Sequence, residues 1–283
     1  MHHKGERILA VFFATVLYCK AVVASKELGM VPNAVDDQYI GCRDKVLKDV
    51  TQNLLNKELS NSEAFKTTWV TKRLCQSLIR GGVEEHTTAL LAYTHSSPYF
   101  RKSFNNDVET MGENATIYAS NFHFKSFHFL LMDSMNLLNK GKCQTLYHLS
   151  ATKYNAKLGA EIRFGRFTEA QQDNMDLLED PDIEDGTLFN ITSCSVLSVK
   201  ENICNQGQIG MLLSPAEVFT VEEVKAHNND GYRYTEIVLK HKKMFSYHNC
   251  YLSSWSTTTG SCTLNLASNV LVTIVVSFSV FTS

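Results

Sequence analysis

The sequence predicts an α+β fold, with a helical first half packed on a β-rich second half. Apolar residues recur at helical spacing in segments before residue 141, and short β-branched or aromatic segments separated by turn residues follow residue 143. The composition, with 44% hydrophobic and 20% charged residues, excludes intrinsic disorder and collagen-like repeats. A formal net charge of -2 with scattered Lys and Arg gives no reason to expect nucleic-acid binding.

The helical lobe is expected over about residues 30–141. Apolar side chains recur at helical spacing in 44–59 and again in 124–141, where Gly141 provides a C-terminal stop. Residues 87–94 form a further short apolar segment between these two helices. Each segment has an apolar face that a common core can bury.

The β lobe is expected over about residues 143–250, because five segments there are short, β-branched or aromatic, and bounded by turn residues. These predicted strands are 145–151, 160–167, 187–196, 216–224 and 232–240. Residues 169–186 carry eight carboxylates and are expected to form a solvated acidic loop or a frayed helix. Residues 197–210 are expected to form a second loop that leads into a strand.

The N-terminal segment, residues 1–24, has the features of a secretory signal peptide. Lys4 and Arg7 precede an apolar core at 8–18 that is too short to span a bilayer, and small residues before Ser25 allow cleavage. The alternative is a buried N-terminal helix. A signal peptide would direct the mature chain to the secretory pathway, either secreted or retained at the cell surface.

The C-terminal segment, residues 256–283, has the features of a glycosylphosphatidylinositol (GPI) anchor signal. Small residues at 260–262 and a short polar spacer precede the apolar run 270–281, and only two residues follow that run. The alternative is a terminal β-strand of the core. With both ends removed, the domain spans about residues 25–255 and is held by a lipid on the extracellular face of the plasma membrane.

An extracellular location makes disulfides the expected state of the cysteines. Two of the eight cysteines lie in or next to the terminal signals, and the other six allow three bridges. These six are Cys42, Cys75, Cys143, Cys194, Cys204 and Cys250. No pair has zinc-ligand spacing, so no metal is expected. Asn114 and Asn190 begin glycosylation sequons, which fit this compartment if they lie on the surface.

Six motifs stand in order along the chain between about residues 30 and 250. They are NAVDDQYIGC (33–42), HTTALLAYT (86–94), FHFKSFHFLL (122–131), Leu146-Tyr147, EIRFGRFT (161–168) and SPAEVF (214–219). Together with the terminal signals and the cysteine positions, they resemble the vertebrate ecto-mono-ADP-ribosyltransferases, which are secreted or GPI-anchored. The resemblance implies the ADP-ribosyltransferase fold, with a cleft between the lobes. In that cleft NAD or NADP would bind, the nicotinamide–ribose bond would break, and ADP-ribose would pass to a protein arginine.

The resemblance also implies catalytic positions. In the family an Arg clamps the NAD phosphates, a Ser orients the catalytic carboxylate, and a Glu-x-Glu pair supplies that carboxylate where positive charge develops on the ribose. Counted from the matching motifs, the Arg position is His148, the Ser position is Glu169, and the Glu-x-Glu positions are Gln208 and Gly210. All of these positions are therefore substituted, and Glu169 is the candidate for a substitute carboxylate.

Four residues are expected, by the same resemblance, to bind the nucleotide: Tyr93, Tyr147, His148 and Arg166. A neutral imidazole at His148 offers at most one donor where a guanidinium offers a charged fork. Arg166 could replace part of the charge that is lost there, so that nucleotide binding outlives catalysis.

The resemblance further implies disulfides between Cys42 and Cys250 and between Cys143 and Cys194. Cys75 and Cys204 are left to pair with each other or to remain free thiols. Two functions stay open: a family transferase whose activity is weak or absent, with an acceptor that the sequence does not name, and a non-catalytic surface antigen or binding module on the same GPI-anchored scaffold.

Overall fold

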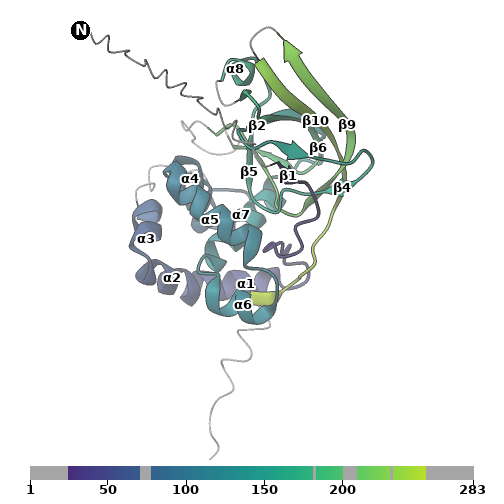
Figure 1. Cartoon of the computed structure of the whole chain (residues 1–283). Coiled ribbons are helices and arrows are strands. Elements are labelled where there is room, and N and C mark those ends of the chain that lie inside the picture. Colours follow the sequence, from purple (N-terminus) through teal and green to yellow (C-terminus); the bar gives the residue numbers. More distant parts are fainter. Residues whose placement is uncertain (1–24, 71–77, 181–182, 200–208, 230–231, 253–283) are drawn as a thin grey trace, which may run out of the picture.

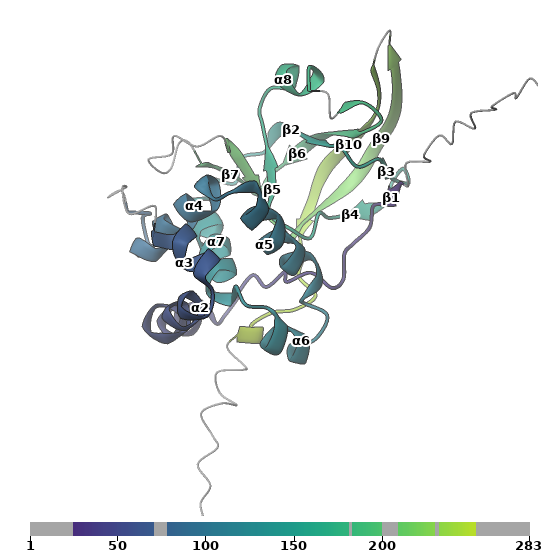
Figure 2. The ribbon, with the colours of Figure 1, turned by 60° about the vertical axis from the view of Figure 1, so that its left-hand side comes forward.

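The protein has two lobes, with helices on one side and strands on the other in both ribbon views (Figure 1, Figure 2). The computed structural model describes residues 25–70, 78–180, 183–199, 209–229 and 232–252. The chain crosses between the lobes after Leu138, where α7 ends, and before Gln144, where β2 begins. The predicted signal peptide 1–24 and the predicted anchor signal 256–283 lie outside the described residues.

Helix α7 (Lys125–Leu138) is the centre of the helical lobe, and every residue from Lys125 to Met135 is buried. Helix α4 (Glu84–His95) packs beside it and is buried from His86 to Thr94. The other helices are α1 (Arg43–Asp49), the π-helical turn η1 (Val50–Leu54), α2 (Leu55–Asn61), α3 (Glu63–Val70), α5 (Pro98–Thr110) and α6 (Ala115–Asn121).

Side-chain caps fix where α5 and α7 begin. Ser97 accepts a backbone hydrogen bond in the first turn of α5, and Pro98 occupies the first helical position. The buried carboxylate of Glu58, on α2, accepts from the backbone N–H of Lys125 at 3.0 Å and of Ser126 at 2.9 Å, so it caps α7 from another helix. Burial raises the pKa of Glu58 to about 7.

The β lobe is built on a five-stranded sheet with the strand order β2-β6-β10-β9-β4, in which only β10 and β6 are parallel. Its strands are β2 (Gln144–Ser150), β4 (Glu161–Ile162), β6 (Thr187–Ser193), β9 (Glu217–Asn229) and β10 (Tyr232–Met244). A second sheet has the order β5-β8-β7. The remaining elements are β5 (Thr168–Ala170), β7 (Val196–Ser198), β8 (Met211–Leu213), the pair β1 (Lys26–Glu27) and β3 (Tyr154–Asn155), and the one-turn helix α8 (Met175–Leu178).

Strand β8 connects the cores of the two lobes. Successive side chains of a strand point to opposite faces. Leu212 accordingly joins the hydrophobic cluster of the helical lobe, whereas Met211 and Leu213 join the cluster of the β lobe. The three-stranded sheet is therefore covered on both faces, and β8 lies at the junction of the lobes.

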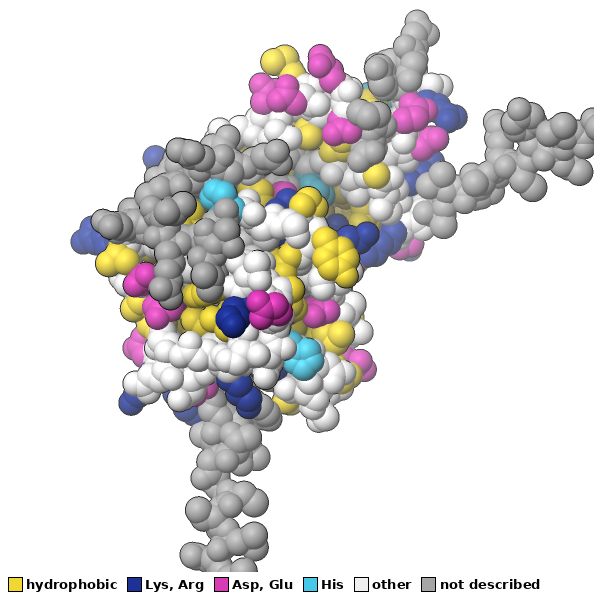
Figure 3. Space-filling model, turned by 90° about the vertical axis from the view of Figure 1, so that its left-hand side faces the viewer, with side chains coloured by type: hydrophobic (Ala, Val, Ile, Leu, Met, Phe, Trp, Pro, Cys, Tyr) yellow, Lys and Arg dark blue, Asp and Glu magenta, His cyan; other side chains and the backbone are white. Residues whose placement is uncertain are grey.

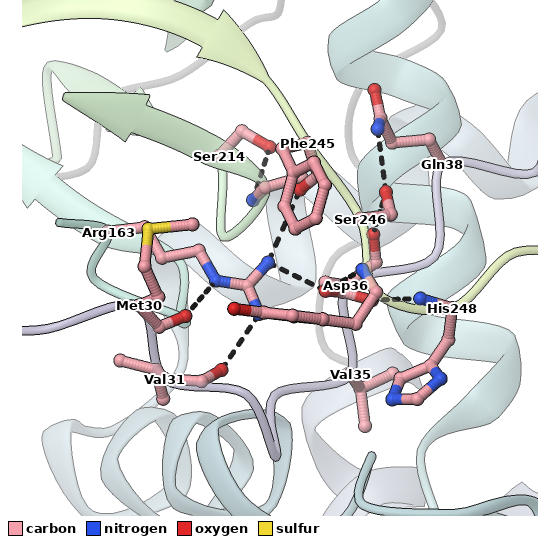
Figure 4. Close-up of polar contacts among 12 residues, drawn as sticks. Met30, Val31, Val35, Asp36, Gln38, Arg163, Ser214, Phe245, Ser246 and His248 are labelled. Atoms are coloured by element: carbon pink, nitrogen blue, oxygen red, sulfur yellow. Dashed lines mark hydrogen bonds and ion pairs between the residues drawn. The ribbon is translucent and has the colours of Figure 1, made fainter. Parts of the chain in front are cut away.

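A buried ion pair ties the N-terminal and C-terminal segments to the end of β4. Arg163 and Asp36 are both fully buried, with 2.6 Å between Nη1 and Oδ2. Figure 4 shows the guanidinium directed at backbone carbonyls and the carboxylate directed at backbone N–H groups. These partners are the carbonyls of Met30, Val31 and Phe245 and the N–H groups of Tyr247 and His248.

Two disulfides are formed, as the resemblance implied. Cys42 and Cys250 are joined with an S–S distance of 2.03 Å, and this bridge links the residue before α1 to the segment after β10. Cys143 and Cys194 are joined between the start of β2 and the end of β6. Cys75 and Cys204 lie outside the described residues.

The α+β fold class and both predicted helices are confirmed, and the helix predicted at 44–59 runs without interruption through α1, η1 and α2. The strand predicted at 160–167 is wrong beyond Ile162. Gly165 has a φ of +66°, and a Cβ there would lie 2.7 Å from the Val31 side chain, so the chain turns at this point. The acidic segment 169–186 is also partly ordered, because it begins in β5 and contains α8.

The two sequons lie in different environments. Asn114 is exposed at the start of α6, and its Oδ1 accepts from the N–H of Thr116 and of Ile117 at 3.0 Å. Asn190 is half-buried in the inner strand β6, and its amide nitrogen donates to Glu236 at 3.2 Å. Only Asn114 therefore meets the surface condition. In the described ranges, no helix is long and apolar enough to cross a membrane.

Candidate nucleotide-binding cleft

A polar cleft of about 550 Å³ lies where helix α5 faces strands β2 and β5. Its lining comes from α5, from β2 and Ala151, from residues 166–171, from Leu177 of α8 and Asp180, and from the two residues before β8. On the face shown in Figure 3, acidic and basic side chains are interspersed over the surface.

His148 lies in the cleft as a neutral, fixed ring. Its Nδ1 lies 2.8 Å from the carbonyl oxygen of Glu169, and its ring stacks on Phe189 with centroids 5.9 Å apart. Burial, together with the charge of Arg166, lowers the pKa of His148 to about 4. Because a carbonyl only accepts, the proton of the neutral ring is on Nδ1, and Nε2 is an acceptor. His148 thus has no spare donor for a phosphate at neutral pH.

Arg166 belongs to a charge cluster at one end of the cleft. Its Nη1 lies 3.1 Å from Oε2 of Glu109, and Nζ of Lys26 lies 2.7 Å from Oε1 of the same carboxylate. One carboxylate therefore contacts two cations. This cluster keeps an excess of positive charge near Arg166, which lines the cleft and is one quarter exposed.

Glu169 lies on β5 and is paired with Arg101 of α5, with 2.7 Å between Oε1 and Nε. Arg101 also donates to the backbone carbonyl of Ser96. Both side chains of the pair line the cleft, and Glu169 is 39% exposed there. The ion pair consequently joins the helical lobe to the β lobe within the cleft.

Gly210 lines the cleft directly before β8. Its carbonyl accepts from the N–H of Val199 at 2.9 Å, which fixes its backbone beside β7. A Cβ built at Gly210 has no heavy atom within 4 Å, and the backbone is outside the left-handed region. The position therefore has room for a longer side chain in an ordinary conformation. The second expected catalytic position, Gln208, lies outside the described residues.

Tyr93 lies behind the wall of the cleft. Its side chain is fully buried, and its hydroxyl donates to the carbonyl of Phe167 at 3.2 Å and accepts from the amide of Asn105 at 3.0 Å. Burial raises the pKa of this hydroxyl well above its ordinary value. The structure thus gives Tyr93 a supporting position, in contrast to Tyr147, which is among the lining residues.

Helix α5 supplies residues at the cleft that no sequence motif indicated. Arg101, Asn105 and Glu109 recur every four residues on one face of this helix. They hold the segment from Arg166 to Glu169, with Oδ1 of Asn105 accepting from the backbone N–H of Phe167 at 3.1 Å. The available signal was the Ser-Pro start at residue 97, followed by buried apolar residues at the same four-residue spacing: Phe100, Phe104 and Val108.

A helical lobe and a β lobe around this cleft define a protein similar to solved mono-ADP-ribosyltransferases. The crystal structure of the eukaryotic mono-ADP-ribosyltransferase ART2.2 is 29% identical with a TM-score of 0.63, over 79% of this chain and 98% of that one. A mutant of ART2.2 in complex with NAD is 30% identical with a TM-score of 0.57, over the same shares. The family model for NAD:arginine ADP-ribosyltransferase matches residues 28–246, so the chain belongs to this family.

Curated relatives include ecto-enzymes of the same family. T-cell ecto-ADP-ribosyltransferase 1 of Rattus norvegicus is 32% identical over 240 residues, which cover 81% of this chain and 82% of that protein. T-cell ecto-ADP-ribosyltransferase 2 of Rattus norvegicus is 31% identical over 236 residues, or 80% of each. Across the parts of the chain that the structure describes, no group of three or more His, Cys, Asp or Glu residues could hold a metal ion.

Proposed function

We propose that the cleft binds NAD or a related nucleotide, and that transfer of ADP-ribose to protein arginine is weak or absent in this chain. The observation that carries the proposal is that Gly210, to which the resemblance assigns the place of the catalytic Glu, lines the cleft and has open space where a side chain could be. Tyr147, His148, Arg166 and Glu169 line the same cleft. These residues therefore surround one cleft, which supports the proposal, and the resemblance implies a carboxylate where Gly210 stands.

The chemistry of the family explains why the missing carboxylate matters. Cleavage of the nicotinamide–ribose bond develops positive charge on the ribose, which a carboxylate stabilises. Loss of one such group typically lowers the rate by about a hundred- to a thousandfold. Glu169 is held by Arg101 at 2.7 Å, so as a substitute it would have to leave an ion pair.

The second candidate function is a non-catalytic binding module on the cell surface. The tautomer of His148 favours it, because the ring that stands at the position of the phosphate clamp uses its one donor on the carbonyl of Glu169. In that case the cleft would bind a ligand without breaking a bond. The two functions differ in one observable, which is the release of nicotinamide from NAD.

The test is restoration of the carboxylate. Gly210→Glu should raise the rate of nicotinamide release from labelled NAD by about a hundredfold, with little effect on folding, because the side chain enters open space. Gly210→Gln is the matched control, since it adds the same bulk without the charge. Further addition of His148→Arg and Glu169→Ser should raise the rate beyond the product of the single effects, since these groups act together.

A wild-type rate that is already typical of enzymes, about 1 per second or more, would contradict weak activity and would indicate Glu169 as the substitute carboxylate. Equal rates for Gly210→Glu and Gly210→Gln would show that position 210 is not the catalytic position. Circular dichroism of each variant establishes that it is folded.

We also propose that the mature protein is glycosylated and is held by a GPI anchor on the extracellular face of the plasma membrane. If the protein is active, the acceptor of ADP-ribose is an arginine of an extracellular protein. The terminal sequence signals support this location, and the curated relatives are named as ecto-enzymes. Phosphatidylinositol-specific phospholipase C should release the protein from intact cells. Retention after this treatment would contradict the lipid anchor.

A further inference from the structure

The ion pair between Arg101 and Glu169 is one of several contacts that join the two lobes at the cleft. The two lobes are already joined beside it by the bond from Phe167 to Asn105 and by the pair of Arg166 with Glu109. An ion pair with one partner more than one third exposed contributes little to stability. The pair lies inside the cleft that is proposed to bind a nucleotide, where its charges can affect ligand binding.

We propose that Arg101 and Glu169 determine the affinity of this cleft for phosphate groups: Arg101 binds the phosphates of the nucleotide, and Glu169 is the internal anion that competes with them. This inference rests on the proposed function, because it names the residues that recognise the same ligand. Two guanidinium groups line the cleft in the described part of the chain, those of Arg101 and Arg166. His148 cannot supplement them, since it is neutral and its Nδ1 proton faces a carbonyl.

The chemistry of the pair suits an exchange of partners. A guanidinium carries five N–H donors, more than its two contacts to Glu169 and Ser96 use. Two oxygens of a phosphate can accept from a guanidinium fork in the same bidentate way as the two oxygens of a carboxylate. The carboxylate of Glu169 is a fixed negative charge in the cleft, so it both occupies Arg101 and repels a diphosphate.

The test compares ADP-ribose with adenosine, which lacks the diphosphate and the second ribose of ADP-ribose. Binding of ADP-ribose and of adenosine is measured by calorimetry on the purified full chain. Glu169→Gln keeps the size of the side chain and removes its charge, so it should tighten ADP-ribose binding by about tenfold at low salt. Arg101→Gln should weaken ADP-ribose binding by about the same factor. Adenosine binding should change less than twofold in both variants.

The double variant separates competition for Arg101 from repulsion alone. If Glu169 acts by occupying Arg101, Glu169→Gln should increase the affinity for ADP-ribose much less in a variant that already carries Arg101→Gln. Arg233→Gln is the matched control, because Arg233 is paired with Glu184 and Asp185 outside the cleft and is 59% exposed. It should leave the affinity for both ligands unchanged.

Several outcomes would overturn the inference. If the wild type binds ADP-ribose but Glu169→Gln does not tighten it, Glu169 does not compete with phosphate. If Arg101→Gln weakens the binding of adenosine as much as the binding of ADP-ribose, Arg101 supports the shape of the cleft and does not bind phosphate. If no variant binds either ligand at millimolar concentration, the proposed nucleotide binding fails as well.

Discussion

The change Asp36→Asn tests the buried ion pair between Asp36 and Arg163, which ties the segments before α1 and after β10 to the end of β4. Asn keeps the volume of Asp but places an amide where Oδ2 now accepts from Arg163 at 2.6 Å and from the N–H of Tyr247 at 2.7 Å. Arg163 would stay fully buried without its counter-charge. Removal of one partner of a buried ion pair typically costs about 3–5 kcal/mol in the free energy of unfolding. For a domain of this size the melting temperature should fall by roughly 6–20 °C.

The assay is urea and thermal unfolding of the purified full chain with its disulfides intact, followed by circular dichroism. Arg233→Gln serves again as the control, because its exposed ion pairs should contribute less than about 0.5 kcal/mol. A loss below about 1 kcal/mol in the free energy of unfolding for Asp36→Asn would refute the reasoning that the buried Arg163 depends on Asp36 as its counter-charge.

Peptide mapping should find a glycan on Asn114 and none on Asn190, whose amide nitrogen donates to Glu236 within the sheet; the reverse pattern would contradict the assignment. Replacement of Cys42 and Cys250 together by Ser should lower the free energy of unfolding by up to about 5 kcal/mol, because the bridge joins residues 208 apart; an unchanged urea midpoint would show that the bridge is dispensable. The free energy of unfolding should fall as the pH drops from 6.5 to 4.5, since the unfolded chain protonates His148 near 6.5 and the folded chain only near 4. In His148→Gln this fall should be smaller by about 1–2 kcal/mol at pH 5, and identical pH profiles would contradict the low pKa.

The periodicity of apolar residues predicted the helices that bury a wide face. The helix at 44–59 and the buried helix α7 carry several apolar residues per two turns, so their pattern is strong. Helix α5 was missed because it has one buried apolar residue per turn, and the polar residues between them pair with the β lobe. Such a helix is stabilised by tertiary contacts that no local pattern contains.

The strand ends depended on similar tertiary information. Segment 160–167 is aromatic and β-branched, but the left-handed Gly165 and the buried Arg163 turn it toward the N-terminal segment. Strands β9 and β10 extend beyond their predicted ends, to Asn229 and Met244, because they continue to pair with each other after the apolar pattern stops.

The residues of the cleft were found only in part from the sequence. Motif spacing located His148, Arg166, Glu169 and Gly210, because each is a fixed count from a recognisable motif, and all four line the cleft. It could not locate Arg101, which reaches the cleft from a helix that carries no such motif. Nor could it show that the proton of His148 faces a carbonyl, since that carbonyl belongs to the neighbouring strand β5.

The most direct test of the account is a single experiment on the wild-type full chain that measures both NAD binding and nicotinamide release. Saturable binding of NAD, together with nicotinamide release at least about a hundredfold slower than in the Gly210→Glu variant, is the expected result. Release by the wild type as fast as by that variant, or no NAD binding at millimolar concentration, would contradict the claim that this cleft binds the nucleotide without efficient catalysis.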